Sequence, residues 1–356
     1  MAVFRGSGAV RGTLDTIVSF VLGVVAKQFT AASVGLLVLD GALNIQEDIR
    51  RYLPELPGYP SPVRVGHLLA HTSGLPSGHD LDRSAGMTAR AQFSTSDRAR
   101  AIATATLQAE PGTAHQYSNH GYVLLAELAR RVCGVPLGEF AATGIFGPLG
   151  ISHTGFFDSA GCPQAVPGWT DDGQRVDIAF TCVGDGGLVS CVEDLARWVG
   201  WLPSSPLAQL MVGPRPSLPD GTWAHDAWGL SVRTHRGRRI ESHGGSLDGY
   251  LGSFVRFPEA KLSFIALANS DAGGVLAFGG RLRAFVDLTL AGGSIPVSRR
   301  GPRPTAYLPA DRPTHAGRGA ALQLTTRAVR KHKDLQLRKL VAGEPVGASP
   351  KGWDHC

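Results

Sequence analysis

The sequence predicts an α/β (α+β) fold in which an antiparallel sheet is flanked by helices. Four short runs with β-branched and aromatic residues follow one another between residues 228 and 269, separated by Gly, Pro or charged turns. Strands that are consecutive in this way pair in an antiparallel meander. Before them, and again after residue 275, apolar residues recur at helical spacing. The predicted architecture is therefore a sheet with helices packed on it.

The helices are predicted from the spacing of apolar residues and from stop signals. The first spans 26–40, where Phe29, Ala32 and Leu36 are close to helical spacing and Gly41 follows as a stop. Further helices are expected in the ranges 63–71, 121–134 and 192–202, and the polar segment 78–110 is helix-biased. Gly and Pro are frequent at 158–187, so loops are predicted there.

The strands of the meander are predicted at 228–235, 238–243, 250–257 and 262–269. A final helix at 275–291 is expected to pack on their sheet. From residue 295 the chain is rich in Pro, Gly, Arg and Lys, a composition typical of disordered segments.

These elements suggest one domain and one tail. The domain comprises residues 1–294, with a sheet part formed by 1–40 and 225–294 and a helical part at about 41–224. Residues 295–356 form the basic tail, which we expect to be disordered; its deletion from residue 299 onward should leave the fold intact.

The positive charge of the chain is concentrated in that tail. The net charge is +6, but residues 299–356 carry 12 Lys and Arg against four Asp and Glu, a net of +8, so residues 1–298 carry −2. A nearly neutral body argues against a nucleic-acid-binding protein. The basic tail is interpreted as a solvated segment, with an acidic partner as the alternative.

No run of 18 apolar residues occurs, so we expect no membrane partner. The apolar run at 17–26 follows Arg5 and Arg11 and has the features of a secretory signal, which leaves export as an alternative to the cytoplasmic location that we expect. The five cysteines are odd in number and include no CxxC pair, so reduced thiols are predicted.

Several familiar catalytic motifs are absent. No GxSxG elbow and no glycine-rich phosphate loop occurs. His67 and His71 have the i, i+4 spacing of zinc ligands, but Leu68 stands where a zinc protease has its glutamate. Helix packing is the favoured interpretation of this pair, and we expect neither a metal nor another cofactor.

Three segments carry residues suited to acyl transfer: Lys27 in the first turn of a helix, Tyr117 and Asn119 directly before a long helix, and His243 with its glycines at the end of a strand. A lysine held in apolar surroundings loses its preference for the charged form and can act as a base. A tyrosine can pass a proton to a leaving group, and glycines let a carbonyl approach backbone N–H groups closely. Each residue alone is more commonly structural, so the combination is what carries the hypothesis.

Over roughly residues 15–290 the sequence resembles the serine β-lactamase-like family, which includes class C β-lactamases, D-alanyl-D-alanine carboxypeptidases and related esterases. The resemblance rests on five blocks in the family's order: GVVAKQFTAA, RVGHLLAHTSGLP, PGTAHQYSNHGYVLLAELA, GDGGLVSCVEDLARW and ESHGGSLDGYLGSFVRFP. It implies a β-lactamase/transpeptidase-like fold, in which an antiparallel sheet flanked by helices lies beside a mostly helical domain and the active site lies between them.

The resemblance also implies roles for residues that match the family's Ser-x-x-Lys, Tyr-x-Asn and Lys/His-x-Gly motifs. Lys27 with Tyr117 would provide the general base. Asn119 and His243, the latter with Gly245, would bind substrate, and the backbone N–H of Ser246 would help to stabilise an oxyanion.

The departure from the family pattern is at the nucleophile. Val24 occupies the position three residues before Lys27, and none of the six lysines has a serine at that spacing. Valine cannot form an acyl-enzyme. Ser19 would point elsewhere, whereas Ser118 and Ser246 are closer to the expected cleft but match positions with other roles. Only 23 residues precede Val24, so the N-terminal part also looks shortened relative to the family.

Two functional hypotheses follow. The first is a hydrolase of amide or ester bonds that is catalytically impaired by the valine, with a substitute nucleophile or water-based chemistry as a variant. The second is a non-catalytic binding module or scaffold for peptidoglycan-like or β-lactam-like ligands. Both predict a small amide or ester as the partner, and neither sets an oligomeric state.

Overall fold

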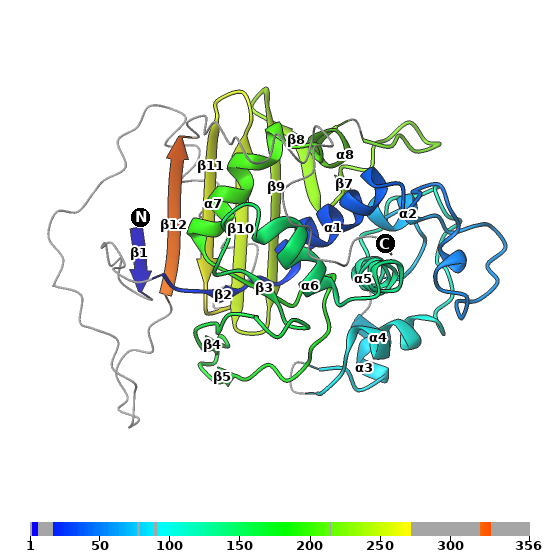
Figure 1. Ribbon diagram of the computed structural model, residues 1–356, viewed down its shortest axis with the longest axis horizontal. Coiled ribbons are helices and arrows are strands. Elements are labelled where there is room, and N and C mark those ends of the chain that lie inside the picture. The colour runs from blue at the N-terminus through cyan, green and yellow to red at the C-terminus, as the bar shows by residue number, and fades with distance from the viewer. Residues whose placement is uncertain are drawn as a thin grey trace, which may run out of the picture.

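The computed structural model describes residues 2–5, 17–76, 79–88, 91–213, 215–271 and 321–328. Figure 1 shows a tall sheet on one side of the molecule and a group of helices on the other. The expected fold class, an antiparallel sheet flanked by helices beside a mostly helical part, is confirmed.

The predicted meander is present. Strands β8 (Leu230–His235), β9 (Arg238–Leu247), β10 (Tyr250–Phe257) and β11 (Leu262–Ala268) pair antiparallel in sequence order, and β7 (Asp226–Ala227) lies outside β8. Strand β9 continues four residues beyond the predicted 238–243, because Gly244 to Leu247 pair with Tyr250 to Ser253 of β10. This extension carries the glycines of the site.

The sheet also contains two strands that the sequence analysis did not predict. β12 (Ala321–Ala328) pairs antiparallel with β11, and β1 (Ala2–Arg5) pairs with β12. The expectation of disorder throughout 295–356 is therefore wrong for β12, whose pairing supplies partners for the backbone groups along the outer side of β11. The helix predicted at 275–291 lies outside the described residues, and the division into a domain and a tail stays a prediction.

Five short strands connect the two parts. β2 (Phe20–Val21) and β3 (Gly155–Phe156) flank β6 (Leu188–Ser190) in a small sheet. β4 (Gly168–Trp169) and β5 (Arg175–Val176) form a hairpin within the region where loops were predicted.

The helices largely match the predicted ranges. Those with a predicted counterpart are α1 (Lys27–Leu39), α2 (Val65–Leu69), α5 (Asn119–Cys133) and α7 (Val192–Trp201). The helix-biased segment 78–110 contains α3 (His79–Ser84) and α4 (Thr95–Ile102). The remaining helices are α6 (Leu137–Ala141) and α8 (Ala208–Val212), with short helical turns at Val24–Ala26, Ile49–Arg51, Ala142–Phe146 and Leu202–Ser204. In the part of the chain that the structure describes, no helix is long and apolar enough to cross a bilayer.

Helix α1 lies near the centre of the molecule, between the sheet and helices α2 and α5 (Figure 1). Ten of its 13 residues are buried, and the Phe29 ring packs against Phe146 and Trp198 with centroid distances of 5.5 and 4.8 Å. One hydrophobic cluster runs through α1, α5, α7 and the sheet. This shared core fixes the start of α1, where the candidate site lies.

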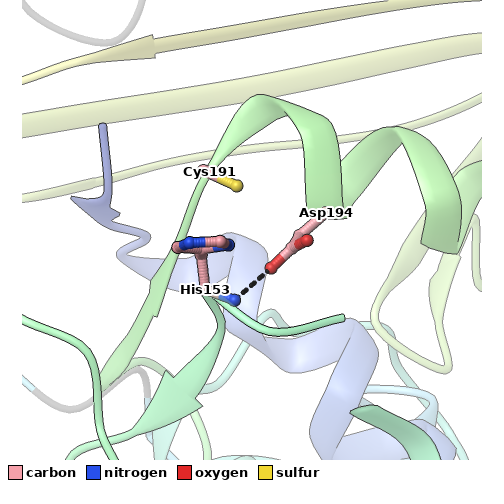
Figure 2. A group of neighbouring side chains, drawn as sticks. All are labelled: His153, Cys191 and Asp194. Atoms are coloured by element: carbon pink, nitrogen blue, oxygen red, sulfur yellow. Dashed lines mark hydrogen bonds between the residues drawn. The ribbon is translucent and has the colours of Figure 1, made fainter. Parts of the chain in front are cut away.

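Helix α7 packs against β11, and Asp194 in its first turn fastens it to the segment before β3. The Asp194 carboxylate accepts hydrogen bonds from the His153 backbone N–H, the Thr154 hydroxyl and the Arg197 guanidinium at 2.7–2.9 Å. Figure 2 shows that His153, Cys191 and Asp194 are neighbours, and potential metal-ligand atoms on them lie within 4.8 Å of one another. Both carboxylate oxygens of Asp194 already accept hydrogen bonds from protein donors, so we assign this residue a structural role.

Candidate active site

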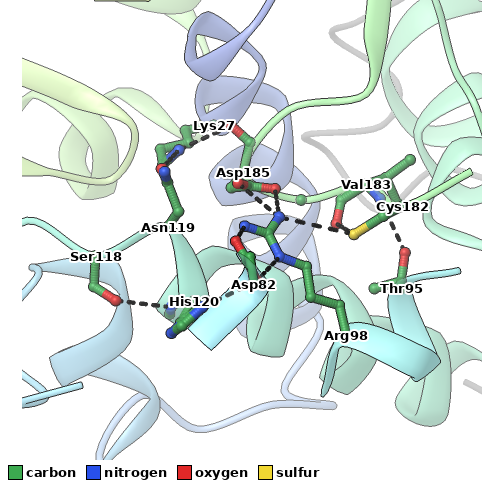
Figure 3. Close-up of polar contacts among 12 residues, drawn as sticks. Lys27, Asp82, Thr95, Arg98, Ser118, Asn119, His120, Cys182, Val183 and Asp185 are labelled. Carbon is green, nitrogen blue, oxygen red and sulfur yellow. Dashed lines mark hydrogen bonds and ion pairs between the residues drawn. The ribbon is translucent and has the colours of Figure 1, made fainter. Parts of the chain in front are cut away.

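The site is built around Lys27, the first residue of α1, whose side chain is fully buried. Its Nζ donates hydrogen bonds to Oδ1 of Asn119 at 2.7 Å and to the backbone carbonyl of Asp185 at 2.8 Å (Figure 3). The ammonium also lies 5.2 Å from the centroid of the Tyr117 ring and 5.5 Å from that of Tyr122. Three segments that are distant in sequence therefore meet at one amine.

Burial lowers the pKa of Lys27 to about 7. Loss of hydration disfavours the charged form; the Asp185 carboxylate raises the pKa and the Arg98 guanidinium lowers it. A neutral amine is therefore accessible near neutral pH. A neutral lysine that donates its two N–H groups to Asn119 and Asp185 retains a lone pair, so the side chain is suited to accept a proton.

Tyr117 and Asn119 are held by the beginning of α5. Ser118 caps this helix: its hydroxyl donates to the Pro76 carbonyl at 2.9 Å and accepts from the N–H of Gly121. Burial raises the pKa of Tyr117, so the phenol stays protonated at neutral pH. Its hydroxyl is buried and, within the described residues, has no hydrogen-bond partner. Buried polar groups are normally hydrogen-bonded, so this hydroxyl is an exception that calls for an explanation.

The third segment is the end of β9. The rings of His243 and Tyr117 are 6.4 Å apart, and Nδ1 of His243 lies 3.0 Å from the carbonyl oxygen of Gly244. Burial, reinforced by the charge of Lys27, lowers the pKa of His243 to about 4, so this imidazole is neutral at physiological pH. Ser246 is exposed beyond it, at the rim of the site.

Val24 lies against this strand, in the helical turn that leads into α1. A Cβ atom on Gly245 would be 2.2 Å from Cγ2 of Val24, and a Cβ on Gly23 would be 2.4 Å from the Ser246 carbonyl oxygen. The two chain segments therefore approach so closely that a side chain would clash at either Gly245 or Gly23. Unlike the buried Val25 and Ala26, Val24 is partly exposed, so its hydrocarbon side chain forms part of the surface of the site.

The structure thus brings together all the residues that the sequence analysis selected, but the serines near the site have other partners or positions. The Ser118 hydroxyl is committed to its cap. Ser19 is buried, and its hydroxyl donates a hydrogen bond to the His153 backbone carbonyl at 3.5 Å. Ser246 is exposed and also lines a cavity of about 610 Å³, together with Leu247 and Leu251, Thr170 and four aspartates, Asp171, Asp172, Asp248 and Asp271.

His71 packs beside the tyrosines of the site and does not form a pair with His67. Helix α2 ends at Leu69, two residues short of the predicted end, and His71 adopts a left-handed conformation with φ 55°. Its ring stacks on Tyr117 and Tyr122, and its Nδ1 accepts a hydrogen bond from the Ser118 N–H at 3.1 Å. His67 instead bonds to the Arg64 backbone N–H. The zinc-type pair therefore does not form, and His71 supports the Tyr117 ring.

The sequence reasoning missed Asp185 and Arg98. Asp185 belongs to the GDGG block, so its place in a motif was available as a signal, whereas no pattern marked Arg98. Arg98 bonds to the carboxylates of Asp82 and Asp185 and contacts the sulfur of Cys182 (Figure 3). Its position depends on the packing of α4, which residue spacing does not reveal.

Comparisons with known proteins show the family to which the chain belongs. The sequence model of the Beta-lactamase family matches residues 12–287, so the chain belongs to the Beta-lactamase family of serine hydrolases. A protein named D-aminopeptidase from Gluconobacter oxydans is 27% identical over 255 residues, covering 69% of this chain and 48% of the relative. The chain thus spans about half the length of this curated relative.

Two solved structures have a similar fold. The octameric penicillin-binding protein homologue from Pyrococcus abyssi has a TM-score of 0.65 and 23% identity, covering 82% of this chain and 73% of its own. The D-amino acid amidase from Ochrobactrum anthropi SV3, solved with D-phenylalanine, has a TM-score of 0.64 and 24% identity, covering 79% and 95%. At this identity the likeness establishes the fold.

Proposed function

We propose that this chain is a β-lactamase-related serine hydrolase homologue in which acyl transfer is impaired because Val24 occupies the nucleophile position. The observation that carries the proposal is local. Val24 lies against Gly245, three residues before the buried Lys27, and the Tyr117 hydroxyl lacks a hydrogen-bond partner among the described residues. The candidate amine and phenol remain, whereas valine occupies the sequence position at which the family has its nucleophilic serine.

The retained groups suit the hydrolysis of an amide or ester. A neutral Lys27 would take the proton of an attacking hydroxyl, and protonated Tyr117 would deliver a proton to the leaving group. The Ser246 N–H would contribute to oxyanion stabilisation. Loss of the nucleophile in a hydrolase of this general kind costs about 10⁶ in turnover and leaves a residual acceleration of about 10³ to 10⁴ from binding and the oxyanion site.

The cavity beside Ser246 supports a choice of ligand. Four aspartates line it, and a concentration of carboxylates favours a ligand that carries positive charge. Similar proteins include a D-aminopeptidase and a D-amino acid amidase. We therefore propose small amides with a free amino group as ligands. A scaffold that binds no such ligand is the alternative.

The test measures turnover and binding separately in the unmodified protein. D-phenylalanine p-nitroanilide should give no release of p-nitroaniline above the small residual rate. Isothermal titration calorimetry should detect binding of D-phenylalaninamide. N-acetyl-D-phenylalaninamide lacks the positively charged amino group and should bind at least about tenfold more weakly. Robust turnover contradicts impairment. Absence of binding by both amides contradicts the ligand-binding proposal and favours the scaffold.

A further inference from the structure

Both acceptors of the Lys27 amine are connected to a single guanidinium, that of Arg98. The Asp185 carbonyl accepts from Lys27, while both carboxylate oxygens of the same residue accept from Nη1 of Arg98 at 2.9 Å. The position of this carbonyl therefore depends on the ion pair. The side chains of Arg98 and Asp185 are only 11% and 13% exposed, so water screens the pair weakly.

The second connection passes through the residue after Asn119. Nε2 of His120 lies 3.4 Å from Oδ1 of Asp82, and its side chain is fully buried. Asp82 in turn accepts from Nε of Arg98 at 2.9 Å and pairs with Nη2. Asn119 and His120 begin α5, so this contact links the start of that helix to Arg98 (Figure 3).

Helix α4 also contacts the loop that contains Asp185, through Thr95. The Thr95 hydroxyl accepts a hydrogen bond from the Val183 N–H at 3.0 Å, and Thr95 and Arg98 lie one turn apart on α4. The planar guanidinium is suited to bridging two carboxylates, which a lysine ammonium cannot do in the same fork geometry. Helices α3 and α4 therefore contact both segments that accept hydrogen bonds from Lys27. These are the loop that contains Asp185 and the start of α5, which contains Asn119.

We propose that Arg98 is a positioning residue that fixes both acceptors of the Lys27 amine and thereby sets the protonation of the candidate base. The inference rests on the proposed function only in treating Lys27 as the base. It assigns Arg98 no contact with substrate.

The charges around Lys27 give the expected direction of the effect. Asp185 raises the pKa of Lys27 and Arg98 lowers it. Removal of the guanidinium both deletes a positive charge and leaves the Asp185 carboxylate unpaired, so the pKa of Lys27 should rise. The other titratable groups facing this amine come from the segment after α2, from the start of α5 and from β9: His71, Tyr117, Tyr122 and His243.

The experiment is a ¹³C NMR titration of protein labelled at the lysine Cε. Six lysines give few signals, and loss of one signal in Lys27→Met assigns Lys27. In Arg98→Met the pKa of Lys27 should rise by about one unit or more from its value of about 7. Adding Asp185→Asn should reverse most of that rise. Arg98→Lys, which keeps a charge, should give a smaller rise.

Arg100→Met is the matched control, because Arg100 lies on the same helix, is exposed and pairs with Asp97 at the surface. It should leave the Lys27 titration unchanged. An unchanged pKa in Arg98→Met overturns the proposal; if that variant does not fold, an unchanged pKa in Arg98→Lys overturns it. The titration needs no turnover, so the proposed function can fail while this inference stands, and the reverse also holds.

Discussion

At the scale of single residues, the site is defined by what Val24 lacks. Val24 lies against β9 at Gly245, and the same site holds the buried Lys27 amine, whose pKa is lowered to about 7, and the Tyr117 phenol, which stays protonated. The sequence alone predicted this departure, because the lysine spacing is fixed along the chain. It could not predict that the Tyr117 hydroxyl would lack a partner, since that depends on how three segments meet.

Lys27 should make stability depend on pH. Its pKa in the folded protein is lowered from 10.5 to about 7, so between these values the unfolded chain binds more protons. Stability from this group therefore increases with pH across that range, by about 1.4 kcal/mol per pH unit, and the contribution is constant outside it. Denaturant unfolding of the wild type and Lys27→Met at pH 7, 8 and 9 measures the difference.

The free energy of unfolding of the wild type, relative to Lys27→Met, should increase over this series. The loss of hydrogen bonds in the variant shifts all values equally and does not alter the slope. A difference that stays flat from pH 7 to 9 contradicts a lowered pKa for Lys27.

At the scale of elements, prediction succeeded where a pattern is local. Helix α5 begins after the Ser118 cap and is followed by Gly134, whose φ of 75° suits glycine, and both residues are visible in the sequence. Helix α2 ended earlier than its apolar residues suggested: His71 adopts a left-handed conformation, and its ring stacks on Tyr117, which precedes α5, and on Tyr122 within α5. The extension of β9 was missed because its glycines give no strand signal.

Asp194→Asn tests the structural role of the cluster in Figure 2. The carboxylate serves three donors, including a backbone N–H and a guanidinium, and an amide cannot accept all of them. The variant should lose about 1–3 kcal/mol of unfolding free energy in denaturant titration. Glu259→Gln, at an exposed position, is the control and should change stability little. Equal stability of the two variants would refute the structural role.

At the scale of the whole molecule, composition predicted the nearly neutral body, and periodicity predicted the meander and the central helices. Composition misled for β12, because a segment rich in Arg and Gly carries a strand that pairs with β11 across Ala321–Ala328. Pairing between residues about 60 positions apart leaves no local signal in the sequence. The arrangement of Arg98, Asp82 and Asp185 was hidden for the same reason.

Truncation tests the contribution of β12. A chain that ends at residue 294 lacks this strand and leaves the outer backbone groups of β11 without a partner. Its midpoint of thermal unfolding should fall by roughly 5 °C or more. A chain that ends at residue 328 keeps β12 and should unfold like the full chain. Equal midpoints for the two truncations would show that β12 adds no stability and would restore the original prediction for the tail.

Labelling with a fluorescent penicillin, followed by gel electrophoresis and peptide mass spectrometry, tests the central claim most directly. The wild type should acquire no covalent label, whereas Val24→Ser should be labelled at position 24, faster as the pH rises through about 7 because Lys27 must be neutral. Label on the wild type at Ser118 or Ser246 would contradict the account, as would a folded Val24→Ser variant that binds the penicillin but never reacts with it.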